Sequence, residues 1–160
     1  MKQNEEPFMM KESRYTEGTV LSPALELAEK IKQTGRRSPQ DLIPLIDQAE
    51  ELASSAPDAF TRGVSIRAAG NAHQLLNNFT AALERYDTAI ELFESTGDKG
   101  QVGRTLLAKV GLLFYLSRFD ELFECARVAQ GIFEDQGDEA ALARLRVNLG
   151  NAYQRLDRYH

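Results

Sequence analysis

The sequence matches itself at an offset of 40 residues, and this internal repeat limits the possible folds more than any other feature. A repeat of this length is one supersecondary unit that cannot bury its apolar face alone, so it has to stack on similar units. The recurring sets are Pro57-Asp58 with Gly97-Asp98 and Gly137-Asp138, Ala49 with Ala89 and Ala129, Phe79 with Phe119 and Tyr159, and Gly70-Asn71-Ala72 with Gly150-Asn151-Ala152.

Each repeat contains two apolar patterns with the spacing of α-helices. Within residues 64–76, apolar residues recur every three or four positions, which places them on one helix face. The same spacing returns over residues 82–93, and Asn77-Asn78-Phe79-Thr80 between them favours a turn and a new helix capped by Thr80. The next period repeats this arrangement over residues 106–116, 117–120 and 122–133. No stretch alternates polar and apolar residues as a strand does, which predicts an all-α protein.

The boundaries between units carry signals that end one helix and start the next. Gly97 and Gly137 can adopt the left-handed backbone conformation that closes a helix. The aspartate that follows suits the N-terminus of the next helix, because that end carries a partial positive charge. Asp98 and Gln101 also have the spacing of a capping box. The aspartates that we expect at N-caps are Asp58, Asp98 and Asp138.

Prolines set the helix boundaries of a weaker first unit. Ser22-Pro23 and Ser38-Pro39 each match a cap followed by a proline in the first turn. Pro44 would cost about 3 kcal/mol in the interior of a helix that began at Pro39. We therefore expect that helix to begin near Asp41, where Pro44 falls in the first turn and no hydrogen bond is lost.

These patterns predict an α-solenoid of antiparallel helix pairs, with about seven helices in three and a half repeats of 40 residues. Residues 1–19 show no periodicity and are expected to form a loose lead-in. The repeat domain is expected to cover residues 20–160. Its units are 20–57, 58–97, 98–137 and a truncated unit, 138–160.

The last predicted helix carries an apolar stripe that no following helix would cover. Terminal repeats of solenoids normally have a polar outer face, so the chain resembles a piece of a longer array. We expect the stripe to be exposed and available for a homodimer, because a twofold contact buries the same patch on both partners. Its residues are Leu142, Leu145, Leu149, Tyr153 and Leu156.

Composition limits the kinds of partner and the compartment. The net charge of −5 argues against general affinity for nucleic acid. No run approaches the about 20 apolar residues of a membrane-spanning helix, and residues 1–17 lack the apolar core of a secretory signal. The single cysteine, Cys125, cannot form an internal disulfide, which suits a reducing compartment. We expect a cytoplasmic protein that binds neither nucleic acid nor membrane.

The repeats resemble the tetratricopeptide pattern, which has Leu-Gly and Tyr on a first helix and Ala and an aromatic residue on a second. No unit has the leading Trp, and the third has Val110 in place of Gly and Ala126 in place of the aromatic. The period exceeds the family's 34 residues, so we expect a longer second helix and a longer loop after it. The matches are Ala69-Gly70, His73, Ala82, Tyr86 and Ala89 in the second unit, and Leu149-Gly150 and Tyr153 in the fourth.

The resemblance implies a right-handed superhelix that acts as a protein–protein interaction scaffold or adaptor. A narrower resemblance comes from residues 145–159, which look like bacterial tetratricopeptide arrays that precede a CHAT domain, a caspase-like peptidase module. This likeness implies an alternative role, in which the array docks on a C-terminal effector domain outside this chain and restrains it.

Few side chains suggest catalysis, and we expect no enzyme activity, metal or cofactor. His73 and His160 lie far apart in the repeat, and His73 is expected to be a packed ring with one polar contact. Cys125 has no histidine at a matching position to serve as a base and is expected to be a passive, partly buried thiol. The outer carboxylates have the spacing of a solvated face: Glu91, Glu94, Glu121 and Glu124.

In the tetratricopeptide family the first helices line a concave groove, and the resemblance implies which residues point into it. Amide side chains there would pair with a peptide backbone, an aromatic pair would anchor the ligand, and arginines would attract carboxylates. We therefore predict binding of a protein or peptide, and we expect an acidic one. The carried-over residues are Val64, Arg67, Asn71, Gln74 and Leu75, then Arg104, Leu107, Gly111, Phe114 and Tyr115, then Arg144, Val147, Asn151, Gln154 and Arg155.

One groove of the family, the carboxylate clamp, grips the C-terminus of chaperones. Arg67 and Asn71 stand where its first Lys and Asn would be, and Arg144 and Asn148 stand where its later basic pair begins. Gly111 replaces the middle Asn, and Asn148 replaces a basic residue, which argues against a clamp. The remaining alternative is that these polar side chains are only solvated.

Overall fold

The computed structural model describes residues 22–158, and within that range the chain forms seven α-helices, one 3₁₀ turn and no strand. This confirms the all-α class and the expected number of helices. None of these helices is long and apolar enough to cross a membrane. The lead-in expected at residues 1–19, and the aligned Tyr159, lie outside the described residues. The elements are α1 (Pro23–Arg37), η1 (Pro39–Leu42), α2 (Ile43–Ser55), α3 (Ala59–Leu75), α4 (Phe79–Ser95), α5 (Lys99–Tyr115), α6 (Phe119–Gln136) and α7 (Glu139–Asp157).

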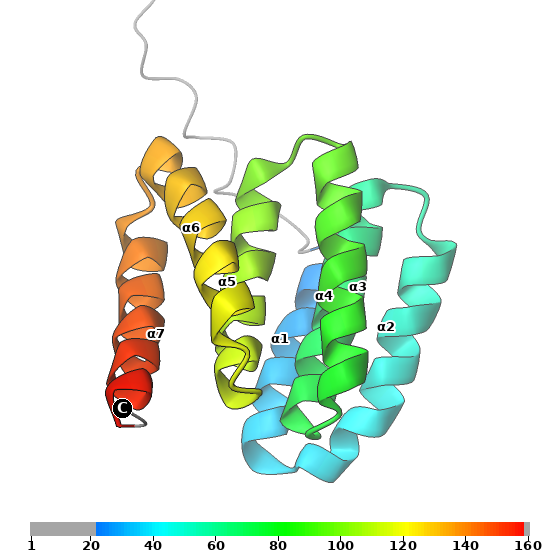
Figure 1. The fold of residues 1–160 in the computed structure, drawn as a ribbon. Helices are drawn as coiled ribbons and strands as arrows, with labels where there is room; N and C mark the ends of the chain where they lie inside the picture. The colour runs from blue at the N-terminus through cyan, green and yellow to red at the C-terminus, as the bar shows by residue number, and fades with distance from the viewer. Residues whose placement is uncertain (1–21, 159–160) are drawn as a thin grey trace, which may run out of the picture.

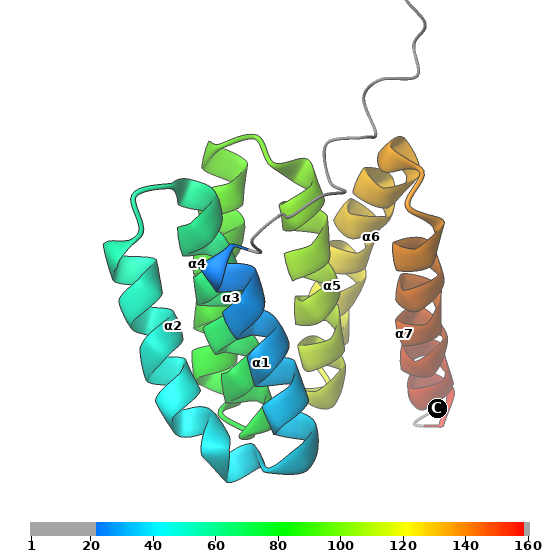
Figure 2. The same ribbon diagram turned by 180° about the vertical axis from the view of Figure 1, so that it is seen from behind.

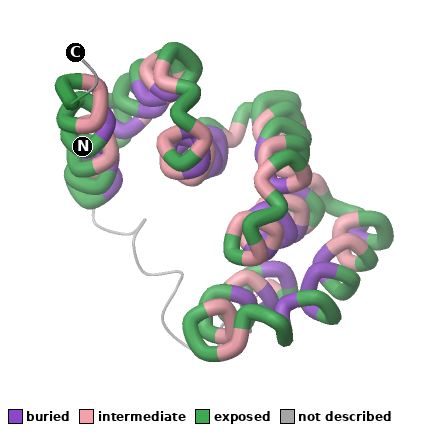
Figure 3. Tube along the Cα trace, turned by 60° about the horizontal axis from the view of Figure 1, so that its bottom comes forward, coloured by how far each residue is buried: buried purple, intermediate pink, exposed green. Residues whose placement is uncertain are grey.

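The helices lie in two layers, which Figures 1 and 2 show from opposite sides. The first layer consists of α1, α3, α5 and α7, in which each helix contacts the next. The second layer consists of α2, α4 and α6, and each of these packs against the first-layer helices before and after it. Buried residues gather on the sides of the helices that face their neighbours (Figure 3). Consecutive helices are therefore antiparallel neighbours.

The helix starts follow the sequence offset from the second helix pair onward. α3, α5 and α7 begin at Ala59, Lys99 and Glu139, each 40 residues after the last, and α4 and α6 begin at Phe79 and Phe119. Two helices of 17 residues and two connections of three residues fill one period. The prediction of a longer loop after the second helix of each pair is wrong, because that connection has only two or three residues. The residues beyond the 34 of the tetratricopeptide period therefore lie in the helices.

Aspartates cap α3, α5 and α7 as predicted. The carboxylates of Asp58, Asp98 and Asp138 each accept a hydrogen bond from the backbone N–H three residues later, at 2.7, 3.1 and 2.9 Å. The bond to the charged form lowers the pKa of Asp58. The predicted capping box is only half formed, because the side chain of Gln101 is buried and its Oε1 has no hydrogen-bond partner.

Other predicted helix starts need correction. Thr80 does not cap α4, which begins at Phe79 with Asn78 as its N-cap and no side-chain hydrogen bond. Ser22 precedes α1 as expected, but its hydroxyl makes no capping bond. Pro44 lies in the first turn of α2 as predicted, although that helix begins at Ile43, because Pro39 starts the 3₁₀ turn η1 instead.

The turns use left-handed backbone conformations. Gly97 and Gly137 have φ angles of 71° and 66°, which confirms the predicted helix closures. Asn77 and Ser117 adopt the same conformation, at 61° and 57°, in the turns within the second and third helix pairs. A residue with a side chain rarely takes this conformation, and asparagine does so most easily.

The two helices of a pair approach closely where a glycine faces an aromatic ring. A Cβ atom built on Gly63 would lie 2.5 Å from the ring of Phe93, and one on Gly103 would lie 2.8 Å from the ring of Phe133. Both rings are fully buried. Ala82 and Ala89, which match alanines of the tetratricopeptide pattern, are also fully buried.

The predicted exposure of the apolar stripe of α7 is wrong for two of its leucines. Leu142 and Leu145 keep 3% and 1% of their surface exposed, because α5 and α6 both pack against α7 and cover this side. Tyr153 is 56% exposed, and its ring stacks on Phe123 at a centroid distance of 4.8 Å. Self-association through α7 stays a prediction, and the buried leucines cannot contribute to it. The half-buried members of the stripe are Leu149 and Leu156.

We expect Asp98→Ala to lower the free energy of unfolding by about 1 kcal/mol, because the substitution leaves a backbone N–H of α5 without its acceptor. Urea denaturation should show a lower midpoint with an unchanged slope. Asp47→Ala, which removes an exposed carboxylate from within α2, is the control and should leave the midpoint nearly unchanged. Equal midpoints for Asp98→Ala and the wild type would contradict the assigned cap.

Candidate functional site

Three pockets lie along the first layer of helices. The α1–α3 pocket has a volume of about 490 Å³, the α3–α5–α7 pocket about 370 Å³ and the α5–α7 pocket about 390 Å³. Arg67 and Asn71 line both of the first two pockets. The pockets therefore form a series that crosses all four helices of this layer.

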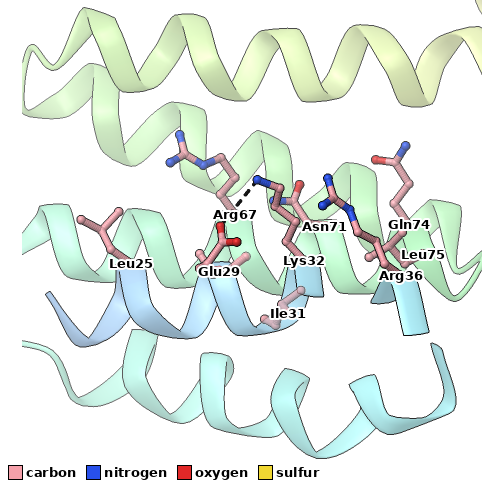
Figure 4. A pocket seen from close by; sticks show the side chains of 11 residues that line it. Leu25, Glu29, Ile31, Lys32, Arg36, Arg67, Asn71, Gln74 and Leu75 are labelled. Carbon is pink, nitrogen blue, oxygen red and sulfur yellow. Dashed lines mark ion pairs between the residues drawn. The ribbon is translucent and has the colours of Figure 1, made fainter. Parts of the chain in front are cut away.

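The α1–α3 pocket combines an apolar floor with basic side chains. Figure 4 shows residues of α1 and α3 pointing into one hollow, where Leu25, Ile31 and Leu75 supply apolar surface. Lys32 pairs with Glu29 at 3.5 Å, as the dashed line marks. Sequence reasoning assigned no groove positions to α1, although its basic and apolar residues recur at helical spacing. The polar residues around this pocket are Glu29, Lys32, Arg36, Arg67, Asn71 and Gln74.

Three arginines from three helices line the α3–α5–α7 pocket: Arg67 from α3, Arg104 from α5 and Arg144 from α7. None of them forms an ion pair with a carboxylate among residues 22–158. Asp138 lines the same pocket, but its carboxylate already caps α7. The pocket therefore holds three cationic side chains against one carboxylate, in a chain whose net charge is negative.

Arg67 is held by contacts within the protein. Its Nη1 donates to the backbone oxygen of Gln101 at 3.5 Å and to Oγ1 of Thr105 at 3.3 Å, and its guanidinium lies 5.6 Å from the centre of the Phe93 ring. Burial lowers the pKa of Arg67 to about 10, with a further contribution from Arg104. The side chain stays charged at neutral pH, but it is half-buried and joins α3 to α5.

The amides of Asn71 and Gln74 surround the hydroxyl of a buried tyrosine. The Tyr86 hydroxyl lies 2.8 Å from Oδ1 of Asn71 and 2.7 Å from Oε1 of Gln74, and Gly70 leaves room for its ring. Burial raises the pKa of Tyr86. The hydroxyl has one proton and donates it to only one of these oxygens at a time, so Tyr86 engages part of the amide pair that the sequence predicted to bind a peptide backbone.

The α5–α7 pocket lies where the two helices end. It is lined by Phe114 from α5, by Asn151, Gln154 and Arg155 from α7, and by Arg158 directly after that helix. Arg155 donates from Nη1 to the backbone oxygen of Phe114 at 3.3 Å, and its guanidinium lies 5.2 Å from the centre of that ring. Phe114 is half-buried against the core. The Phe114 ring therefore forms part of the pocket wall, and Arg155 links α7 to α5 through its contacts with Phe114.

The structure brings most of the predicted groove residues to these pockets. Val64 is an exception, because α1 packs on α3 there and the side chain is only 1% exposed, in one buried cluster with Ala24. Tyr115 and Val147 are 65% and 63% exposed but line none of the three pockets. Leu107 reaches its pocket although it is largely buried. The predicted residues that line pockets are Arg67, Asn71, Gln74, Leu75, Arg104, Leu107, Phe114, Arg144, Asn151, Gln154 and Arg155.

The other reactive side chains have structural explanations. Burial raises the pKa of the half-buried Cys125 thiol, which favours its unreactive form. Burial lowers the pKa of His73, and its Nδ1 has no hydrogen-bond partner among the described residues, so the predicted polar contact stays a prediction for the other ring nitrogen. Among residues 22–158, no group of three or more His, Cys, Asp or Glu side chains is placed to hold a metal ion.

The outer carboxylates lie on the solvated face as predicted. Glu91, Glu94, Glu121 and Glu124 are all exposed. Two of them form ion pairs one turn away, Glu121 with Arg118 and Glu124 with Arg127, both at 2.6 Å.

No protein-family model matches the sequence, and no curated protein matches it. The function proposed below therefore rests on the geometry of the pockets and not on a related protein. The main features of this geometry are a series of pockets, three arginines that pair with no carboxylate in the described part of the chain, and a buried tyrosine whose hydroxyl lies between two amides.

We expect Tyr86→Phe to lower the free energy of unfolding by about 1 kcal/mol at neutral pH, because it removes the hydroxyl from Asn71 and Gln74. The pKa of Tyr86 is raised in the folded state. The hydroxyl therefore makes its full contribution to the free energy of unfolding below about pH 10, the ordinary tyrosine pKa. This contribution is lost as the pH rises toward the pKa of Tyr86 in the folded protein. The difference between the two proteins should shrink above about pH 10.

Urea midpoints of both proteins between neutral pH and about pH 11 measure this difference. Tyr115→Phe, at an exposed ring, is the control. A constant difference between wild type and Tyr86→Phe across that range would contradict the burial of a neutral phenol.

Proposed function

We propose that this chain is a protein-interaction module whose first-layer surface binds an acidic peptide segment. In this proposal the helix pairs form a solenoid with a 40-residue period and tetratricopeptide-like packing. The support is that helix starts, aspartate caps and glycine–aromatic contacts all recur at that spacing. Repeated pairs of this kind create an extended surface on one side of the stack.

The observation that carries the proposal is the set of three arginines in the α3–α5–α7 pocket. Arg67, Arg104 and Arg144 come from three different helices, and within the described chain no ion pair neutralises them. Holding like charges together costs free energy, and a carboxylate ligand would remove that cost. Arginine also suits this role because its planar group binds a carboxylate through two hydrogen bonds.

The neighbouring pockets indicate the length and composition of the ligand. Packed helices lie about 8–10 Å apart, so an extended peptide that crosses four helices covers three spacings, or about 27 Å. An extended peptide covers about 3.3 Å per residue, which corresponds to about eight residues. Leu25 and Leu75 would contact apolar side chains at one end, and Phe114 would do so at the other. The proposed ligand therefore has acidic residues at its centre and apolar residues toward its ends.

Arg104 and Arg144 are the better positions for a test. Both are exposed, whereas Arg67 contacts Gln101, Thr105 and Phe93, so that changing it would also weaken the contact between α3 and α5. The control variant makes the same charge change at Arg127 and Arg146, which are exposed and line none of the three pockets.

We expect Arg104→Glu with Arg144→Glu to weaken binding of a fluorescein-labelled peptide, Leu-Ala-Glu-Glu-Ala-Glu-Ala-Leu, by at least about tenfold. The variant loses two charge-assisted contacts to the peptide carboxylates and places two negative charges beside them, which together can produce such a loss. Binding is measured by fluorescence anisotropy, with circular dichroism to verify helicity. Affinity for the wild type should also fall with salt, because exposed charges are screened over about 8 Å at physiological ionic strength. Equal affinities for the test and control variants, or no dependence on salt, would refute the proposal.

A further inference from the structure

The α3–α5–α7 pocket presents hydrogen-bond donors and almost no acceptors. An arginine side chain has only donors. The oxygen of Asn71 lies 2.8 Å from the Tyr86 hydroxyl, which leaves the amide NH₂ group of Asn71 to face a ligand. The one carboxylate in the lining, that of Asp138, caps α7. A ligand that fits this lining therefore brings several acceptors of its own. The polar side chains of the pocket are Arg67, Asn71, Arg104, Asp138 and Arg144.

Arg67 is held in place and still has donors to offer. It is the least exposed of the three arginines, and it lies on the same side of α3 as Asn71 (Figure 4). Its hydrogen bonds to Gln101 and Thr105 both come from Nη1. The other two nitrogens, Nε and Nη2, keep their N–H groups for a ligand. A side chain that is already fixed loses little conformational freedom when a ligand binds.

The charge of the pocket matches a dianion. Its three arginines and Asp138 give the lining a net charge of +2. Burial lowers the pKa of Arg67, and the charge of Arg104 lowers it further, because the two guanidinium groups repel each other. Asp98 acts in the opposite direction, but it caps α5 and does not line the pocket. One carboxylate would leave the lining at +1, whereas a phosphate monoester carries about −1.5 to −2 charges at pH 7.

The N-terminus of α7 adds a backbone donor to the arginines. Ala140 and Ala141, in the first turn of this helix, line the pocket. The first N–H groups of a helix have no acceptor within the helix. Asp138 accepts the N–H of Ala141, whereas the N–H of Ala140 makes no hydrogen bond within residues 22–158. A free N–H at the positive end of the helix dipole favours a phosphate group beside the arginines.

We propose that the α3–α5–α7 pocket receives a phosphorylated residue of the bound peptide, whose phosphoryl oxygens accept hydrogen bonds from the three arginines and from the N–H of Ala140. This inference rests on the proposed function, the binding of a peptide along the first layer. The pocket lies in the middle of the series, where the proposed peptide has its acidic residues. The planar group of arginine binds two phosphoryl oxygens at once. Phosphorylation of the partner would then control the interaction.

The test compares three rhodamine-labelled peptides that differ only at the fourth residue. The first is Leu-Ala-Glu-Glu-Ala-Glu-Ala-Leu, and the other two have phosphoserine or serine at that position. We expect the phosphoserine peptide to bind the full chain at least about tenfold more tightly than the glutamate peptide, measured by fluorescence anisotropy at about pH 7.5. Glutamate supplies a single negative charge, so this ratio measures recognition of the dianion and not of acidity alone.

The ratio should fall when the pH is lowered to about 5.5. The second pKa of the phosphate is about 6, so the ligand becomes a monoanion. The glutamate carboxyl group, with an ordinary pKa of about 4.3, stays charged. No histidine is among the lining residues of this pocket. A ratio that is the same at both pH values would contradict recognition of the dianion.

Protein variants assign the effect to this pocket. Arg104→Gln with Arg144→Gln should reduce the advantage of phosphoserine over glutamate to less than about threefold. The control, Arg127→Gln with Arg146→Gln, changes exposed arginines that line none of the three pockets and should keep the full advantage. In the ¹⁵N-labelled wild type, the phosphoserine peptide should shift the NMR signals of the Ala140 amide and of the Arg104 and Arg144 Nε–H groups more than the glutamate peptide does.

The outcomes separate this inference from the proposed function. Equal affinities for the phosphoserine and glutamate peptides would overturn the phosphoryl site and leave acidic-peptide binding intact. Binding of the phosphoserine peptide alone would support the phosphoryl site and contradict binding of carboxylates. Absence of binding by all three peptides at millimolar concentration would overturn both. An undiminished ratio in Arg104→Gln with Arg144→Gln, or displacement of the peptide by an equal concentration of inorganic phosphate, would overturn a phosphorylated peptide as the ligand of this pocket.

Discussion

The contact between a glycine on one helix and an aromatic ring on the next is the interaction on which the helix pairs depend. The rings of Phe93 and Phe133 are buried against Gly63 and Gly103, at distances that leave no room for a methyl group. Burying each ring contributes about 1.5–3 kcal/mol, and the close approach lets small residues such as Ala82 and Ala89 complete the contact. The alignment of the first-layer helices, and with it the series of pockets, follows from this packing.

The same space is filled in two ways in successive pairs, and the difference has chemical consequences. Gly70 with Tyr86 and Val110 with Ala126 distribute a similar volume differently between the two helices. The first arrangement brings a hydroxyl to the first layer and needs polar partners, which Asn71 and Gln74 supply. The second arrangement is apolar. A departure from the repeat pattern in the sequence thus becomes a paired substitution in the structure.

Local signals in the sequence predicted much of the fold. The helix breaks at Gly97 and Gly137 and the cap at Asp98 depend on residues within one turn, and these predictions are confirmed. Contacts between distant residues were not predictable in this way. Arg67 was predicted to face a ligand, yet it bonds to Thr105, 38 residues later in the sequence. The burial of Leu145 was missed because it depends on α5 and α6 packing on α7 together.

The most direct test of the glycine–aromatic contact is the stability of Gly103→Ala, measured by urea denaturation alone and together with Phe133→Leu. In a helix, alanine is more favourable than glycine by about 1 kcal/mol, so a site with free space would gain stability. A Cβ at Gly103 would lie 2.8 Å from the ring of Phe133, and we predict a net loss of about 1–2 kcal/mol from overpacking. In the Phe133→Leu background the same change should be neutral or stabilising. A Gly103→Ala protein more stable than the wild type would contradict the contact.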